Sequence, residues 1–139
     1  MHDPFELERF VIAQNPVFDG VCAQLARGRK EGHWMWFVFP QLRGLGQSWM
    51  ANRYGISSRQ EAQAYLQHAL LGPRLRLCTE LVNRIESRPV EQIFGPVDAM
   101  KFRSSMTLFS EVTTDNDVFA LALGKYFGGQ PDPLTLQRL

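Results

Sequence analysis

Cysteine is scarce in this chain, because its 139 residues include two, Cys22 and Cys78. No C-x-x-C pair and no Cys/His cluster of zinc spacing occurs, which argues against a disulfide framework and a zinc site. Both cysteines fall on apolar stripes of helical spacing, so we predict free, buried thiols in a reducing compartment. No HExxH motif is present either, and we expect no metal site.

The chain also lacks an excess of charge of either sign. Fifteen Lys and Arg residues oppose 14 Asp and Glu residues, which leaves a net charge of +1. This balance argues against the dominant electrostatic attraction that duplex DNA or an anionic membrane requires. The basic residues are mostly arginine, whose planar fork suits carboxylate and phosphate. A coding bias or a thermally robust surface is the alternative explanation for this preference.

Long hydrophobic runs are absent as well. The longest run, Trp34–Phe39, is far too short to span a bilayer. The first ten residues, MHDPFELERF, carry early acids and no apolar segment of the signal-peptide type. We therefore expect a cytoplasmic protein without a membrane partner. The length and the 45% hydrophobic content predict one domain over residues 1–139 with a sizeable core.

Proline and glycine divide the sequence into short helical pieces. The clearest stripe runs from Leu75 to Ile85 at helical spacing. Ser58 and Glu61 have the spacing of a capping box, and Gly28 is a natural helix end. No run shows sustained strand-type alternation. We predict a mainly α, single compact domain of about seven or eight short helices joined by loops punctuated by Pro and Gly.

The densest signal in the chain is Lys30–Gly46, KEGHWMWFVFPQLRGLG. Its apolar centre fits a buried short helix or an extended segment, because Pro40 argues against a strand that continues into a sheet. Aromatic runs of this kind usually form core. A core, however, does not need the polar residues and glycines that gather at both ends of this run.

These flanks predict a ligand site. His33 is a natural acid or base at neutral pH, and Glu31 is the alternative group. Trp34 and Trp36 have rings that can stack on a flat base. The candidate catalytic residues are therefore His33 and Glu31, and the candidate ligand-binding residues of this stretch are Lys30, Trp34, Trp36, Gln41, Arg43, Gly44 and Gly46.

The glycines of the Gln41–Gly46 segment let a backbone approach a ligand closely, and Arg43 can clamp a phosphate or carboxylate. The segment is not a Walker A loop, which requires GK[ST], and it does not have the form of a dinucleotide fingerprint after a strand. We therefore expect no cofactor. A plain loop with a glycine helix cap is the alternative interpretation.

A second polar patch occupies the segment KFRSS. On a helix, Lys101, Ser104 and Ser105 fall at i, i+3 and i+4 on an otherwise apolar stripe. Polar groups there need partners if they are buried, and a phosphorylated ligand would supply them to these residues and to Arg103. The alternative is a solvated face whose serines bond back to the helix. We expect this patch and Lys30–Gly46 to line one concave pocket.

Four ordered motifs, GRKEGHWMWFVFPQLRGLG, HALLGPRL, KFRSSMTLF and KYFGGQPDPLT, resemble the bacterial domain-of-unknown-function 1810 family over nearly the whole chain. Members of that family are often labelled calpastatin, but this sequence does not resemble a disordered protease inhibitor. Its size and helical layout are also similar to the NADAR (YbiA-like) group, which is linked to NAD and ADP-ribose chemistry. That similarity implies N-glycosidic cleavage of a phosphorylated ribosyl compound or an ADP-ribosylated base, and it transfers no catalytic residue to this chain.

Two hypotheses of different classes follow. The first is a pocket that binds a nucleotide or ADP-ribose-like phosphorylated ligand, with N-glycosidase or other hydrolase activity. In it, His33 or Glu31 acts on the substrate, a Trp ring stacks the base, and Arg43, Lys101 and Arg103 hold phosphate. The second is a non-catalytic interaction or regulatory domain in which the aromatic run is core.

Overall fold

The computed structural model describes residues 2–139, and all the regular structure in this range is helical. Six helices have seven or more residues: α1 (Glu8–Gln14), α2 (Phe18–Arg27), α5 (Arg59–Gln67), α6 (Leu71–Asn83), α8 (Pro96–Glu111) and α9 (Asp117–Phe127). Four are shorter: α3 (Met35–Val38), α4 (Trp49–Arg53), α7 (Val90–Phe94) and α10 (Pro133–Arg138). The prediction of a mainly α, single compact domain is confirmed for these residues.

The expected number of helices was too low. The described chain has ten helices where about seven or eight were expected, because helices of four to six residues are too short to show a periodic apolar stripe. The expected domain 1–139 also includes Met1, which lies outside the described residues. No helix in the range 2–139 combines the length and the apolar character that a membrane crossing demands.

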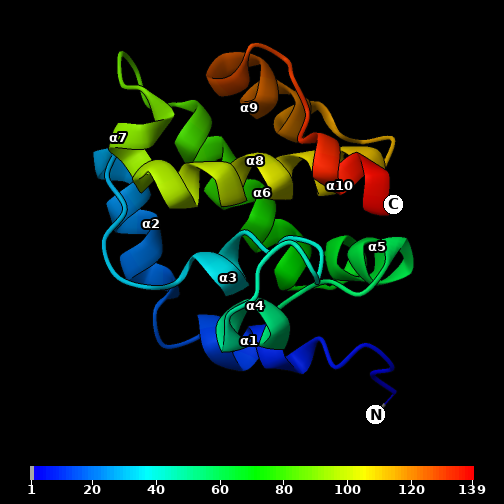
Figure 1. The fold of residues 1–139 in the computed structure, drawn as a ribbon. Coiled ribbons are helices and arrows are strands. Elements are labelled where there is room, and N and C mark those ends of the chain that lie inside the picture. The colour runs from blue at the N-terminus through cyan, green and yellow to red at the C-terminus, as the bar shows by residue number, and fades with distance from the viewer. Residues whose placement is uncertain (1) are drawn as a thin grey trace.

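Helix α8 crosses the centre of the molecule and packs against α7, α9 and α10 (Figure 1). Helix α6 packs against α2, α5 and α9. Helices α1 and α4 lie at the opposite end of the molecule from α9, and α3 lies between these two ends (Figure 1). The loop that follows α3 is joined to the segment after α4 by an isolated parallel bridge between Leu42 and Ile56.

Local signals set several of the helix ends. Gly28 ends α2 with a left-handed φ of +83°, a conformation that costs glycine little. The Ser58 hydroxyl accepts a hydrogen bond from the Glu61 amide at 3.1 Å and so caps α5. The Glu61 carboxylate does not reach back to Ser58, as a capping box would require, but accepts from the Ser57 amide at 2.8 Å. The reciprocal half of the predicted box is therefore displaced by one residue.

The aromatic run of residues 34–39 supplies the centre of the core. Its middle forms the short buried helix α3, which was one of the two conformations expected. The Phe39 ring meets the rings of Phe94 and Phe102 edge-on at centroid distances of 5.9 and 5.1 Å. The Phe94 and Phe102 rings stack at 4.8 Å. Aromatic contacts thus fasten α3 to α7 and α8.

Candidate functional site

A cleft of about 340 Å³ opens between the loop after α3, the first half of α8 and the start of α10. We call it the α8–α10 cleft. Its lining combines cationic, polar and apolar side chains: Gln41, Leu45, Gly46, Val97, Met100, Lys101, Arg103, Ser104, Asp132 and Leu134. Five predicted ligand-binding residues from two distant stretches of sequence therefore lie around one concavity.

One face of α8 forms the floor of this cleft. Val97, Met100, Lys101 and Ser104 occupy positions i, i+3, i+4 and i+7, which share a side of a helix. Val97 and Met100 are exposed, so an apolar surface lies beside the Lys101 cation in the open part of the cleft.

The Lys101 ammonium group is held at the edge of the cleft. It lies 3.4 Å from Asp98 Oδ1 and 4.5 Å from the centroid of the Trp36 ring. The other oxygen of the same carboxylate, Oδ2, lies 3.0 Å from Lys30 Nζ. The Lys30 side chain is 7% exposed, and its ammonium lies over the Trp34 ring. The Asp98 carboxylate therefore pairs with both Lys30 and Lys101, and the three side chains together keep one net positive charge next to the cleft.

Helix α10 is attached to α8 by polar contacts that the cleft residues make. Arg103 donates from Nε to Gln130 O at 2.9 Å and from Nη2 to Pro131 O at 3.1 Å. The Ser104 hydroxyl lies 3.0 Å from Asp132 Oδ2. That oxygen also accepts from the Thr135 amide and hydroxyl, at 3.2 and 2.6 Å, and caps α10. These contacts hold α10 against α8, so Arg103, Ser104 and Asp132 fix the shape of the cleft and also line it.

The candidate catalytic residues lie elsewhere. Glu31 and His33 are exposed and line a separate concavity of about 310 Å³ against α2, together with Trp34. The Trp34 side chain is 4% exposed, and its indole N–H donates to Gln24 Oε1 at 2.8 Å. We call this the His33 concavity.

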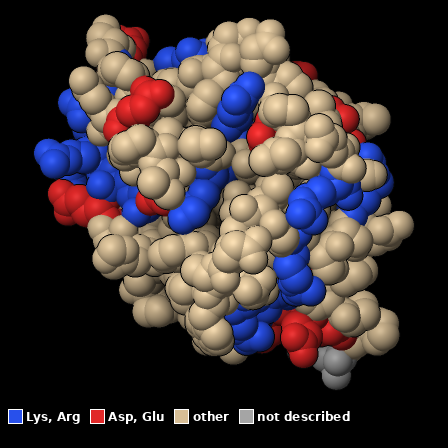
Figure 2. Space-filling model, viewed as in Figure 1, with Lys and Arg blue, Asp and Glu red and all other residues tan. Residues whose placement is uncertain are grey.

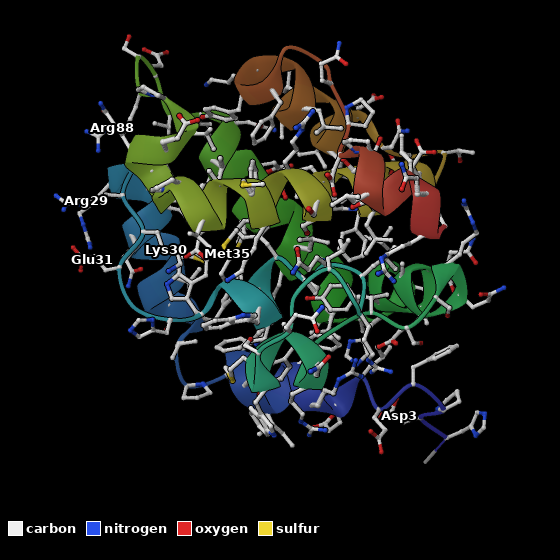
Figure 3. The ribbon with its side chains drawn as sticks, viewed as in Figure 1. Asp3, Arg29, Lys30, Glu31, Met35 and Arg88 are labelled. Atoms are coloured by element: carbon white, nitrogen blue, oxygen red, sulfur yellow. The ribbon has the colours of Figure 1, made fainter. Side chains whose placement is uncertain are left out.

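The side chains of residues 29–35 do not all face the same way, because Arg29, Glu31 and His33 are exposed whereas the Lys30 side chain, Trp34 and Met35 are buried. Figure 3 shows Lys30 and Met35 directed toward the interior, while Arg29 and Glu31 point away from the molecule. These different directions explain why neighbouring residues of one dense motif lie at different surfaces.

Three other predicted residues lie outside the α8–α10 cleft. Arg43 lines a third concavity between α1, α4 and α5, with Arg9 and Arg53. The Arg138 side chain covers Gly44, because a Cβ atom there would meet Arg138 Nη1 at 2.7 Å. Ser105 is fully buried, and its hydroxyl finds no hydrogen-bond partner among residues 2–139. The predicted set is therefore distributed over three surfaces and the core.

Asp98 and Asp132 are the site residues that sequence reasoning did not select. Asp98 precedes Lys101 by three residues, the spacing of a helical ion pair, and this signal is readable in the sequence. The position of Asp132 as the cap of α10 is also readable. Its place in the cleft depends on the contact of α10 with α8, which local sequence does not reveal.

Comparisons with known proteins agree with this fold. The model of the family described as "Protein of unknown function (DUF1810)" matches residues 4–139. The crystal structure of the conserved hypothetical protein Rv1873 from Mycobacterium tuberculosis is similar, with a TM-score of 0.98 and 60% sequence identity. That similarity covers 99% of this chain and 98% of the other. No curated protein gives a significant match.

Proposed function

We propose that this chain, which belongs to the DUF1810 family, binds a nucleotide or ADP-ribose-like phosphorylated small molecule in the α8–α10 cleft. The observation that carries the proposal is that residues from separate sequence motifs meet in this one cleft. Three of the four motifs that define the family resemblance, far apart in sequence, each contribute residues to this cleft: Gln41 and Gly46, then Lys101 and Ser104, then Asp132 and Leu134.

The cleft has chemistry for an anionic end of such a ligand. Lys101 has one carboxylate partner, at 3.4 Å, and an ammonium group carries three donors, so it keeps capacity for a phosphate oxygen. Two nitrogens of Arg103 donate to backbone carbonyls, and the guanidinium presents further N–H groups. Gly46 lets the loop after α3 pack closely on α4, because a Cβ atom there would lie 2.7 Å from Ala51 Cβ.

The cleft also has a surface for an apolar or aromatic part. Leu45, Val97, Met100 and Leu134 provide it, and the Gln41 amide supplies both a donor and an acceptor for a heterocycle edge. A volume of about 340 Å³ is near the lower end of small-molecule sites, which begin at roughly 300 Å³. A mononucleotide-sized group fits such a volume better than an entire dinucleotide.

Glycosidic cleavage normally uses a carboxylate near the scissile bond. In the α8–α10 cleft that carboxylate is Asp132, whose Oδ2 serves as the helix cap. Its Oδ1 makes no hydrogen bond with another of the described residues. For hydrolysis in this cleft, Asp132 is therefore the group that acts as acid or base. His33 and Glu31 face a different concavity.

Calorimetric titration tests this proposal. NAD, ADP-ribose, AMP and ribose 5-phosphate are titrated into the wild type and into Lys101→Gln. At least one compound should bind, and Lys101→Gln should weaken it about tenfold or more, since a charge-assisted bond contributes roughly 1.5–3 kcal/mol. Arg27→Gln is the matched control, because Arg27 is exposed and its ion pair with Glu31 is long, at 3.9 Å. Equal weakening in both variants would contradict the proposal.

One observation favours the alternative of an interaction domain. Val97, Met100 and Leu134 are each more than half exposed around the same cleft, and exposed apolar groups of this kind also occur at protein interfaces. The same titration separates the two, since an interaction domain would bind none of the four compounds.

A further inference from the structure

We propose a second binding site in this molecule, an oxyanion site at the concavity between α1, α4 and α5, where Arg43 and Arg53 take a phosphate or carboxylate group. We call it the arginine cleft. It has a volume of about 370 Å³ and is separate from the α8–α10 cleft. The proposal is independent of the function proposed above.

The base of the arginine cleft is a buried ion pair. Arg9 Nη2 lies 2.8 Å from Glu61 Oε2, and their side chains are 4% and 2% exposed. The other Arg9 hydrogen bonds all go to backbone carbonyls: Phe5 O at 2.5 Å, Glu6 O and Gly55 O at 3.1 Å, and Arg53 O at 2.9 Å. Together with the Glu61 contact, these four bonds use all five N–H groups of the guanidinium. Arg9 is therefore a fixed, neutralised support and not itself a ligand-binding group.

Arg43 lies against this support with donors to spare. Its Nη2 donates to Gly55 O at 3.3 Å, the same carbonyl that Arg9 Nη2 contacts at 3.1 Å. Within residues 2–139 that is the one hydrogen bond of the Arg43 guanidinium, so most of its N–H groups remain available. Because Glu61 neutralises Arg9, the positive charge near this carbonyl that has no carboxylate partner among the described residues is that of Arg43, and a bound oxyanion would offset it.

Arg53 supplies a second exposed fork. Its guanidinium lies 6.0 Å from the Tyr54 ring centroid, and no hydrogen bond or ion pair joins it to another described residue. Its backbone is fixed, because its carbonyl oxygen accepts from Arg9 Nε. The buried Arg9 therefore makes hydrogen bonds beside both exposed arginines, to Arg53 O and to Gly55 O, which Arg43 also contacts.

The charge of this lining favours an anion. Arg9 and Glu61 cancel, and Arg43 and Arg53 then oppose Glu6 alone, which leaves one net positive charge. Asn52 and Ser57 add polar groups to the wall. Figure 2 shows Lys and Arg side chains following one another along the right side of the viewed face, with Asp and Glu side chains at the lower end of this run. Arginine forks bind planar or tetrahedral oxyanions with two parallel hydrogen bonds.

The loop after α3 is a wall common to both clefts. Gln41 and Gly46 line the α8–α10 cleft, whereas Arg43 between them lines the arginine cleft. This arrangement explains why Arg43 belongs to a dense polar motif although it does not meet Lys101 in one pocket.

Pyrophosphate titration in a Lys101→Gln background tests the arginine cleft, because this variant removes the Lys101 contact to phosphate in the other cleft, and the Arg43 and Arg53 substitutions then report on the arginine cleft alone. We expect saturable binding of one equivalent by calorimetry at low ionic strength. Adding Arg43→Gln and Arg53→Gln together should weaken that binding about tenfold or more. Adding Arg27→Gln, which removes the same type of charge from a distant exposed position, should leave it within about twofold.

Two further measurements test the role of the arginine forks. Arg43→Lys keeps the charge and loses the fork, so it should give a loss intermediate between wild type and Arg43→Gln. Malonate in place of pyrophosphate tells whether carboxylates compete for the same arginines. If the double arginine variant does not fold, Arg53→Gln alone is used, because its side chain makes no hydrogen bond to the described chain.

Absence of saturable pyrophosphate binding, or equal weakening by Arg27→Gln, would overturn the second site. Neither outcome bears on the α8–α10 cleft, which is judged by nucleotide binding and by its dependence on Lys101. Loss of nucleotide binding with retained pyrophosphate binding would conversely remove the first proposal and leave this one intact.

Discussion

A single buried carboxylate, that of Glu61, links α5 to α1 and to the loop before α5. It accepts from Arg9 through Oε2 and from the Ser57 amide and hydroxyl through Oε1, at 2.8, 2.8 and 2.7 Å. The sequence predicts Glu61 as a capping residue, but its partnership with Arg9 joins residues 52 positions apart. Such a long-range pair leaves no local pattern, which is why sequence reasoning did not identify it.

Removing this carboxylate should be costly. Glu61→Ala leaves the buried Arg9 charge without its counterion, so we expect a loss of about 3–5 kcal/mol in the free energy of unfolding. Urea unfolding followed by circular dichroism measures it. Glu80→Ala is the control, because Glu80 is half exposed and its pair with Arg84 is long, at 3.9 Å. That control should change stability by less than about 0.5 kcal/mol.

Both cysteines are free thiols, as predicted from their positions, and Cys78 is buried. Cys22 is partly exposed, so the prediction of a buried thiol is wrong at this position. Burial raises the pKa of the Cys78 thiol, and proximity to Cys22 raises it further. Burial also raises the pKa of the Tyr65 hydroxyl.

These raised pKa values predict a loss of stability at alkaline pH. The unfolded chain ionises its thiols above about pH 8.5 and its phenols above about pH 10, whereas the folded chain keeps Cys78 and Tyr65 protonated. Stability should therefore be unaffected near pH 7 and fall as the pH rises from about 8.5 to 10. Urea midpoints at successive pH values measure this fall.

Cys78→Ala isolates the thiol contribution. This variant should be less stable at pH 7 because of the cavity it creates, yet its stability should decline less steeply between about pH 8.5 and 10. Parallel pH profiles for the wild type and Cys78→Ala would show that Cys78 does not contribute.

At the scale of the helix, local chemistry predicts where elements begin and end. Gly28 and Ser58 occupy the capping positions expected of them, and Asp132 caps α10, as its residue type favours. The aromatic run, in contrast, was compatible with helix or extended chain, and packing of Phe39 against the stacked rings of Phe94 and Phe102 decides its path. Because that path also decides which cleft each flanking residue faces, the sequence predicts the candidate site as a list of residues but not as one pocket.

Close packing of α5 on α6 depends on a glycine. A Cβ atom at Gly72 would lie 2.0 Å from the Leu66 carbonyl oxygen, which is backbone and cannot move aside freely. Gly72→Ala should therefore lower the free energy of unfolding by about 2 kcal/mol or more, toward or beyond the upper range for overpacking. Thermal unfolding by circular dichroism measures the effect.

Gly124→Ala is the matched control for this substitution. Gly124 lies within α9, where a Cβ atom would meet nothing within 4 Å. Alanine there should raise stability by about 0.5–1 kcal/mol through helix propensity alone. Opposite signs for the two substitutions are the expected outcome, and similar small effects would show that α5 and α6 can separate without cost.

At the scale of the whole molecule, a series of touching rings crosses the core from α1 to α9. Phe10 meets Tyr65 at a centroid distance of 5.1 Å, Tyr65 meets Phe109 at 5.4 Å, and Phe109 meets Phe119 at 6.0 Å. These rings belong to α1, α5, α8 and α9. The arginine cleft and the α8–α10 cleft are therefore both built on one continuous core, with no seam between the two ends of the molecule.

Such a core predicts unfolding as one cooperative unit, as is usual for single domains of under about 150 residues. Trp34 is 4% exposed and reports on the core, while Trp49 is 71% exposed and reports mainly on solvent. In Trp49→Phe, the urea midpoint from tryptophan emission should coincide with the midpoint from circular dichroism. If α1, α4 and α5 formed a separate folding unit, helix loss would begin at lower urea than the change in emission of the two remaining tryptophans, Trp34 and Trp36. That separation would also mean that ligands of the two clefts stabilise different parts of the chain, whereas a single transition requires each ligand to stabilise the whole.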